Sequence, residues 1–109
     1  MTRARGMSEP TIDPENCQSM TQVRHGIDQL DAEIVALLAR RFGYMRAAAR
    51  IKPDRAAVRD EDRKAQVIAN ATCHAEALGV PVELVRDLWD MLVEGSITYE
   101  LDCWDERRA

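Results

Sequence analysis

The 109-residue chain is poor in the residues from which several common kinds of site are built. It has three widely spaced cysteines and two histidines, and it contains no C-x-x-C pair. A structural zinc site of the usual Cys/His type is therefore not expected. We expect a reduced, cytoplasmic protein in which Cys73 and Cys103 are small buried hydrophobic residues.

The chain also lacks long apolar runs and an excess of positive charge. No apolar run approaches the roughly 20 residues that span a bilayer, and the first residues lack the apolar core of a signal peptide. The formal net charge of −4 argues against a general nucleic-acid binder, which is usually strongly basic. We therefore expect neither a membrane nor a nucleic acid as a partner.

Glycine and proline are few, and they mark the ends of three predicted helices. Residues 1–18 show no periodicity and are predicted to be a flexible tail. Ser19 and Gln22 fit a capping box, and apolar residues then recur at helical spacing. Because Pro53 disfavours helix in the residue before it, this first helix should end near Lys52, after about 30 residues.

Two shorter helices are predicted to follow within a domain that covers residues 19–109. Asp60 is a suitable N-cap for the second helix, and Gly79 is suitable for its C-terminal end. Pro81 suits the first turn of the third helix, whose apolar positions continue to Trp104. No strand-like alternation competes with this pattern, so we predict an all-α fold.

The first helix is too long for the others to cover. At 1.5 Å per residue it spans about 45 Å, and the second helix covers only about half of that length. Monomers rarely expose apolar patches larger than a few hundred Å², and two-fold dimers are the commonest oligomers. We therefore expect an intertwined helical homodimer.

Several polar residues fall on the apolar sides of these helices. With Val23 at zero and 100° per residue, Arg41 lies at about 0° and Lys52 at about 20°. On the third helix, Ser96 and Glu100 lie one turn apart on the apolar face, and Arg63 lies at the margin of the apolar side of the second helix. The other cations of the first helix fall on the solvent side: Arg40, Arg46 and Arg50.

Two interpretations of these inward residues remain open. Arg41 pairs with Glu100 in a buried salt bridge of little net stability while Lys52 reaches water, or the surplus cations bind an anionic ligand such as a dicarboxylate. Arg24 lies about 25 Å from Arg41 along the helix axis. If Arg24 serves the same kind of pocket, it must do so in the other subunit.

The sequence resembles the all-helical chorismate mutase family over about residues 14–104. "PENC", "VRHGIDQLDAEIVALLARRFGYMRAAARIK" and "ITYELDCW" resemble the isochorismate-pyruvate lyase branch, whereas "VRDEDR" is similar to ordinary chorismate mutases. The resemblance implies an intertwined dimer with three helices per chain. It also implies one of two reactions, both without cofactor or metal: rearrangement of chorismate to prephenate, or elimination of pyruvate from isochorismate to give salicylate.

The resemblance implies a role for each member of the residue set. The matching Arg24 crosses from the partner subunit and, with Arg41, holds the two carboxylates of the substrate, while Lys52 donates to its ether oxygen. Arg63 closes over the substrate, and Ser96 is a further polar contact near a carboxylate.

Two positions depart from the family pattern. Most relatives have glutamine where this chain has Glu100, and mutases often have a glutamate where it has Lys64. An ionised Glu100 repels the charge that develops on the ether oxygen, whereas a protonated one donates to it, so we expect a mutase that works better in mild acid. The alternatives are an isochorismate-pyruvate lyase and a non-catalytic helical dimer that binds a dicarboxylate metabolite or a partner protein.

Overall fold

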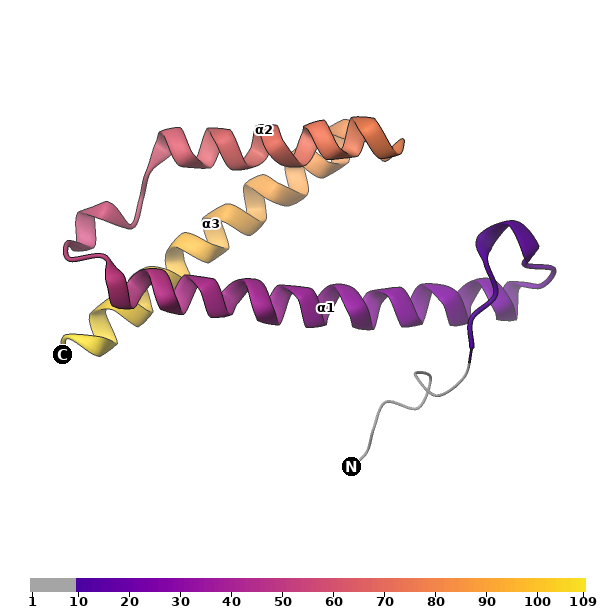
Figure 1. Cartoon of the computed structure of the whole chain (residues 1–109), viewed down its shortest axis with the longest axis horizontal. Helices are drawn as coiled ribbons and strands as arrows, with labels where there is room; N and C mark the ends of the chain where they lie inside the picture. Colours follow the sequence, from indigo (N-terminus) through magenta and orange to yellow (C-terminus); the bar gives the residue numbers. More distant parts are fainter. Residues whose placement is uncertain (1–9) are drawn as a thin grey trace, which may run out of the picture. The chain divides into compact units, whose positions relative to one another are not determined.

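The computed structural model describes residues 10–109, and all regular structure in that range is helical. The elements are η2 (Pro14–Asn16), α1 (Met20–Ile51), η3 (Arg55–Ala57), α2 (Glu61–Leu78) and α3 (Val82–Arg107), and Figure 1 labels the three α-helices. The prediction of an all-α chain with three helices is confirmed. The chain forms two compact units, one ending at Arg41 and one comprising Phe42–Ala109.

The predicted ends of α1 are largely confirmed. Ser19 Oγ accepts a hydrogen bond from the Gln22 N–H at 3.2 Å, as the capping box requires. The Gln22 side chain, however, accepts from the N–H of Gln18 at 2.7 Å rather than from that of Ser19. The helix ends at Ile51, two residues before Pro53.

The caps of α2 are those that the sequence predicted. The Asp60 side chain accepts a hydrogen bond from the Arg63 N–H at 3.0 Å, which satisfies one of the free donors of the first turn. Gly79 ends the helix with φ of 74°, a left-handed conformation that glycine adopts without steric cost. Pro81 directly precedes α3, which begins at Val82.

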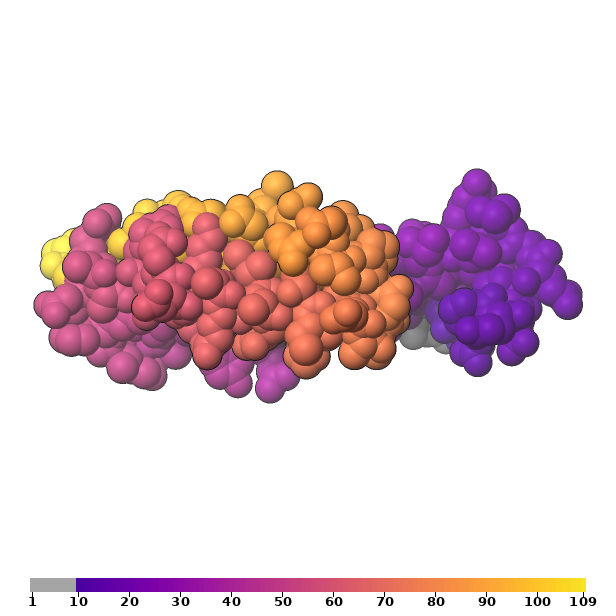
Figure 2. All heavy atoms as spheres, turned by 90° about the horizontal axis from the view of Figure 1, so that it is seen from above, coloured from indigo at the N-terminus to yellow at the C-terminus, as the bar shows by residue number. Residues whose placement is uncertain are grey.

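The second unit is built around the packing of α2 against α3. The two helices are in contact, and α3 runs at an angle to α2 (Figure 1). Seen from above, the atoms of α2 lie in front of those of α3 (Figure 2). One core cluster is formed by Val58, Val93 and Ile97, and the other by Ala71, Ala75 and Val85. Val58 comes from the connection between α1 and α2, so this connection is anchored in the core.

The last turns of α1 also belong to the second unit and contact α3. The rings of Phe42 and Tyr99 meet edge to face with centroids 4.9 Å apart. The Arg46 guanidinium donates to the Tyr99 hydroxyl at 2.8 Å, and Ala49 is completely buried. The C-terminal end of α1 is therefore fixed against α3.

The first unit leaves the apolar stripe of α1 exposed. Ile27, Leu30, Ile34 and Leu37 have exposed fractions between 50% and 63%. Beside the start of the helix, a groove of about 360 Å³ is lined by residues that include Ile12, Pro14, Cys17, Val23, Ile27 and Leu30. An uncovered stripe of this length is the feature from which a homodimer was predicted.

Two sequence-based expectations differ from the structure. Pro14–Asn16 form a 3-10 turn within the segment predicted to be a loose tail, whose residues 1–9 lie outside the described part of the chain. Cys73 is exposed on α2, so the prediction that it is buried is wrong, whereas Cys103 is half-buried. Cys73 lies two residues from both Ala71 and Ala75, and this spacing places it on the opposite side of the helix from that buried pair.

Candidate functional site

Lys52 and Glu100 form an ion pair at the end of α1. Lys52 directly follows the helix, and its Nζ lies 2.8 Å from Oε2 of Glu100 on α3. The Glu100 side chain is 5% exposed and that of Lys52 is 31% exposed. The prediction that Glu100 faces inward is confirmed, and Lys52, which is partly exposed, is an ion-pair partner of Glu100. The pair places a partly exposed cation against a buried carboxyl group.

Ser96 lies one turn before Glu100 on the same buried face of α3. It is 4% exposed, and its hydroxyl donates to the Leu92 carbonyl at 2.7 Å. Because i and i+4 residues lie one above the other on a helix, Ser96 and Glu100 form a short polar strip within an otherwise apolar face. The inward orientation predicted for both residues is confirmed.

Arg63 does not face inward, which corrects the angular prediction. It is exposed, and its guanidinium donates to Gln66 Oε1 at 2.5 Å. The inward cation of α2 is Lys64, because Lys64 shares a helical face with Val67 and Ala71. The sequence prediction measured the angular position of Arg63 from Val67 alone. It therefore placed the buried face of α2 one residue too early.

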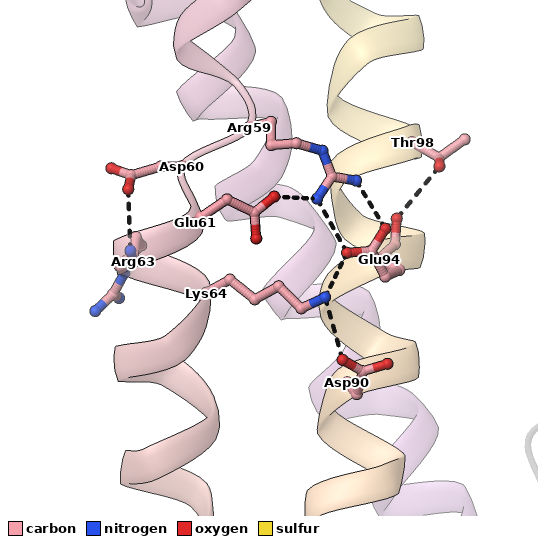
Figure 3. Close-up of polar contacts among 8 residues, drawn as sticks. All are labelled: Arg59, Asp60, Glu61, Arg63, Lys64, Asp90, Glu94 and Thr98. Carbon is pink, nitrogen blue, oxygen red and sulfur yellow. Dashed lines mark hydrogen bonds and ion pairs between the residues drawn. The ribbon is translucent and has the colours of Figure 1, made fainter.

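Lys64 belongs to an ion-pair network that joins the start of α2 to α3 (Figure 3). Its Nζ lies 2.7 Å from Glu94 Oε2 and 3.1 Å from Asp90 Oδ1. Arg59, just before α2, donates to both carboxylate oxygens of Glu94, at 2.7 Å and 3.1 Å, and to Glu61 at 2.9 Å.

These contacts shift the ionisation of the network. The hydrogen bonds from Arg59 and then from Lys64 lower the pKa of Glu94 to about 2. Sequence reasoning missed this network. The signal that could have revealed it is a pair of acids four residues apart on α3, Asp90 and Glu94. They lie opposite two cations near the start of α2, Arg59 and Lys64.

The remaining candidate residues lie in the first unit. Arg24 is exposed on the first turns of α1, and Arg41, the last residue of this unit, is half-buried. The exposed position of Arg24 leaves its guanidinium accessible to another molecule. As predicted, the other arginines of α1 are exposed: Arg40, Arg46 and Arg50.

Two other features are absent from the described part of the chain. Among residues 10–109, no group of three or more histidine, cysteine, aspartate or glutamate side chains is arranged to hold a metal ion. Over the same range, no helix combines the length and apolar character needed to cross a membrane.

Comparison with known proteins decides the family. Residues 23–101 match the model of the family described as chorismate mutase type II. The chain belongs to the chorismate mutase type II family. Isochorismate pyruvate lyase of Pseudomonas aeruginosa is 30% identical over 96 residues, which are 88% of this chain and 95% of that protein. The chain is thus a member of an enzyme family with chorismate mutase or isochorismate pyruvate lyase activity, as the resemblance implied.

The family match includes every residue of the predicted site. Arg24 is the second residue of the matched range and Glu100 is the last but one. The ion pair of Lys52 and Glu100 therefore lies within the part of the chain that matches the chorismate mutase type II family.

Proposed function

We propose that the protein is a chorismate mutase that rearranges chorismate to prephenate in a cationic pocket shared between two subunits. The observation that carries this proposal is the Lys52 ammonium held 2.8 Å from a buried carboxyl group. A cation in a place of low water content stabilises negative charge far more strongly than a cation in water.

The rearrangement suits this set of groups because it is a concerted shift. The ether C–O bond of the enolpyruvyl group breaks while a C–C bond forms, and neither a nucleophile nor a proton transfer is needed. The reaction demands a compact substrate conformation and stabilisation of the negative charge that grows on the ether oxygen. Lys52 Nζ supplies the stabilisation, and binding groups at the carboxylates supply the conformation.

The state of the Glu100 side chain bears directly on this stabilisation. An ionised Glu100 takes up the Lys52 ammonium and repels charge on the ether oxygen, whereas a protonated Glu100 donates to that oxygen beside Lys52. Replacing Glu100 by glutamine, a neutral hydrogen-bond donor, should therefore speed the mutase reaction.

The arginines are proposed to bind the two carboxylates. Arg41 acts from the same chain and the partner subunit's Arg24 from the other, each through a bidentate hydrogen-bonded pair. Arg63 turns toward the pocket when substrate is present, and Ser96 contacts a carboxylate. The exposure of Arg24 and the uncovered apolar stripe of α1 support a dimer in which α1 is buried against a second copy.

Isochorismate pyruvate lyase activity is the second candidate. The similarity to isochorismate pyruvate lyase of Pseudomonas aeruginosa favours it, because the aligned region covers 95% of that protein. Lys52 serves the lyase as well, because elimination of pyruvate also places negative charge on the ether oxygen as its bond to the ring breaks.

A direct assay distinguishes these candidates. The purified protein is incubated with chorismate and, separately, with isochorismate between about pH 5 and pH 8, and prephenate and salicylate are quantified. Lys52→Ala should lower the rate by about 10²- to 10³-fold, and Glu100→Gln should raise the mutase rate at neutral pH. Arg50→Ala removes an exposed cation from the last turn of α1 and is the matched control. It should change neither the rate of prephenate formation nor that of salicylate formation.

Mixing two inactive variants tests the shared pocket. Arg24→Ala and Lys52→Ala dimers that exchange subunits should regain about a quarter of the wild-type rate, because half of the dimers are mixed and each contains one intact site.

Formation of neither prephenate nor salicylate by the wild type would favour a binding protein. A Glu100→Gln variant that is slower than the wild type at neutral pH would contradict the role given to Glu100.

A further inference from the structure

The C-terminal end of α1 is capped by side chains from the far end of the chain. The last carbonyl groups of a helix have no partner within it, and α1 does not end in a left-handed glycine, since Gly79 is the one described residue with a positive φ. Instead, Arg108 donates to the carbonyl oxygens of Ala49, at 3.1 Å, and Lys52, at 2.9 Å. The Trp104 Nε1–H donates to the same Lys52 oxygen at 3.0 Å.

The two donors are themselves held in place. The Arg108 guanidinium lies over the Trp104 ring, with Cζ 4.1 Å from the ring centroid, and it also donates to the Trp104 carbonyl at 3.3 Å. The Trp104 ring packs against the buried cluster that contains Val93 and Ile97. A planar guanidinium stacked on a packed indole loses little further freedom when it binds two carbonyls. Its charge is also favourable at the negative end of a helix dipole.

The capped residue is the one that carries the proposed catalytic cation. Lys52 has its backbone oxygen bound by Arg108 and Trp104, while its Nζ, at the end of a four-carbon stem, meets Glu100. The stem is flexible, so the position of its backbone limits where the ammonium can go. A misplacement of about 1 Å at a reacting group can cost about a hundredfold in rate.

We propose that Arg108, stacked on Trp104, is a positioning residue that fixes the backbone of Lys52 and so holds its ammonium where charge develops on the substrate. This inference rests on the proposed function, because it assigns Arg108 no contact with substrate and an effect that passes through Lys52 alone.

Arg108→Ala tests this, with Arg107→Ala as the matched control because Arg107 is an exposed arginine of the same last turn. Arg108→Ala should lower kcat by about 10- to 100-fold while KM changes less than about threefold. Arg107→Ala should match the wild type. Arg108→Lys should recover part of the loss, because an ammonium reaches one carbonyl but lacks the planar fork. Far-UV circular dichroism corrects each rate for the folded fraction.

A double-mutant cycle separates positioning from general damage. In a Lys52→Ala background, assayed at high enzyme concentration, Arg108→Ala should lower kcat no further, because the group that it positions is gone. If Arg108→Ala folds poorly, Trp104→Phe takes its place in the cycle, since phenylalanine keeps most of the packing and removes the donor to Lys52.

The outcomes are distinguishable. If the wild type is active, two results overturn the positioning role and leave the proposed function intact. One is an Arg108→Ala rate equal to that of the wild type, and the other is a decrease in kcat by the same factor in the wild-type and Lys52→Ala backgrounds. A wild type that forms neither prephenate nor salicylate overturns the proposed function, and the positioning role falls with it.

Discussion

Removing either partner of the Lys52–Glu100 pair should destabilise the fold, but by unequal amounts. Lys52→Met keeps most of the stem and leaves the Glu100 carboxylate, whose side chain is 5% exposed, without its cation. Loss of one partner from a buried pair costs about 3–5 kcal/mol, since a charge is left uncompensated. Because Lys52 is partly exposed, we expect the low end of this range, about 3 kcal/mol.

The reverse change should be milder. Glu100→Gln leaves the Lys52 ammonium, whose side chain is already 31% exposed and whose stem lets it reach water. We expect a loss of about 1 kcal/mol or less, comparable with that of an exposed pair. The double variant leaves no charge unpaired, so it should recover about 2 kcal/mol relative to Lys52→Met alone.

Urea denaturation followed by circular dichroism measures these free energies of unfolding. All variants are compared at one protein concentration, because the stability of the proposed dimer would depend on it. Arg50→Met is the control for removal of an exposed cation near the end of α1, and it should stay within about 0.5 kcal/mol of the wild type. Equal losses for the two single variants, or no recovery in the double variant, would refute the argument that Lys52 compensates the buried charge of Glu100.

Two further predictions concern the second unit. Because Arg59 and then Lys64 hold the pKa of Glu94 at about 2, below its ordinary value of 4.5, Glu94 should contribute stability above about pH 4.5 that is lost as the pH falls toward 2. A plot of melting temperature against pH should therefore show a smaller acid decline for Glu94→Gln than for the wild type, and parallel curves would contradict this role. Val58→Ala removes two methyl groups from a side chain that is 4% exposed, so it should cost about 2–3 kcal/mol in urea denaturation. Val80→Ala at an exposed site should cost less than about 0.5 kcal/mol, and equal losses for the two would show that Val58 is not a core residue.

The sequence was most informative where a signal acts over a few residues. Ser19, Asp60 and Gly79 are cap residues whose hydrogen bonds or φ angle depend on the next turn of the same helix, and all three are found where they were predicted. The buried positions of Ser96 and Glu100 followed from the 3.6-residue period, since both stand among apolar residues on one face of α3. The spaced set of polar residues also sufficed to recognise the family.

The sequence alone did not decide which charged groups meet across the fold. It offered Arg41 as the ion-pair partner of Glu100, whereas Lys52 Nζ lies 2.8 Å from that carboxylate. It also placed Arg63 rather than Lys64 on the inward side of α2, and it gave no sign of the Arg108 contact with Lys52. Partners 30 or more residues apart are chosen by the packing of one helix on another, and a displacement of one residue turns a side chain by about 100°. Local hydrogen bonding and periodicity thus determined the helices of this protein, while the packing of α1, α2 and α3 in the second unit decided which cation faces which carboxylate.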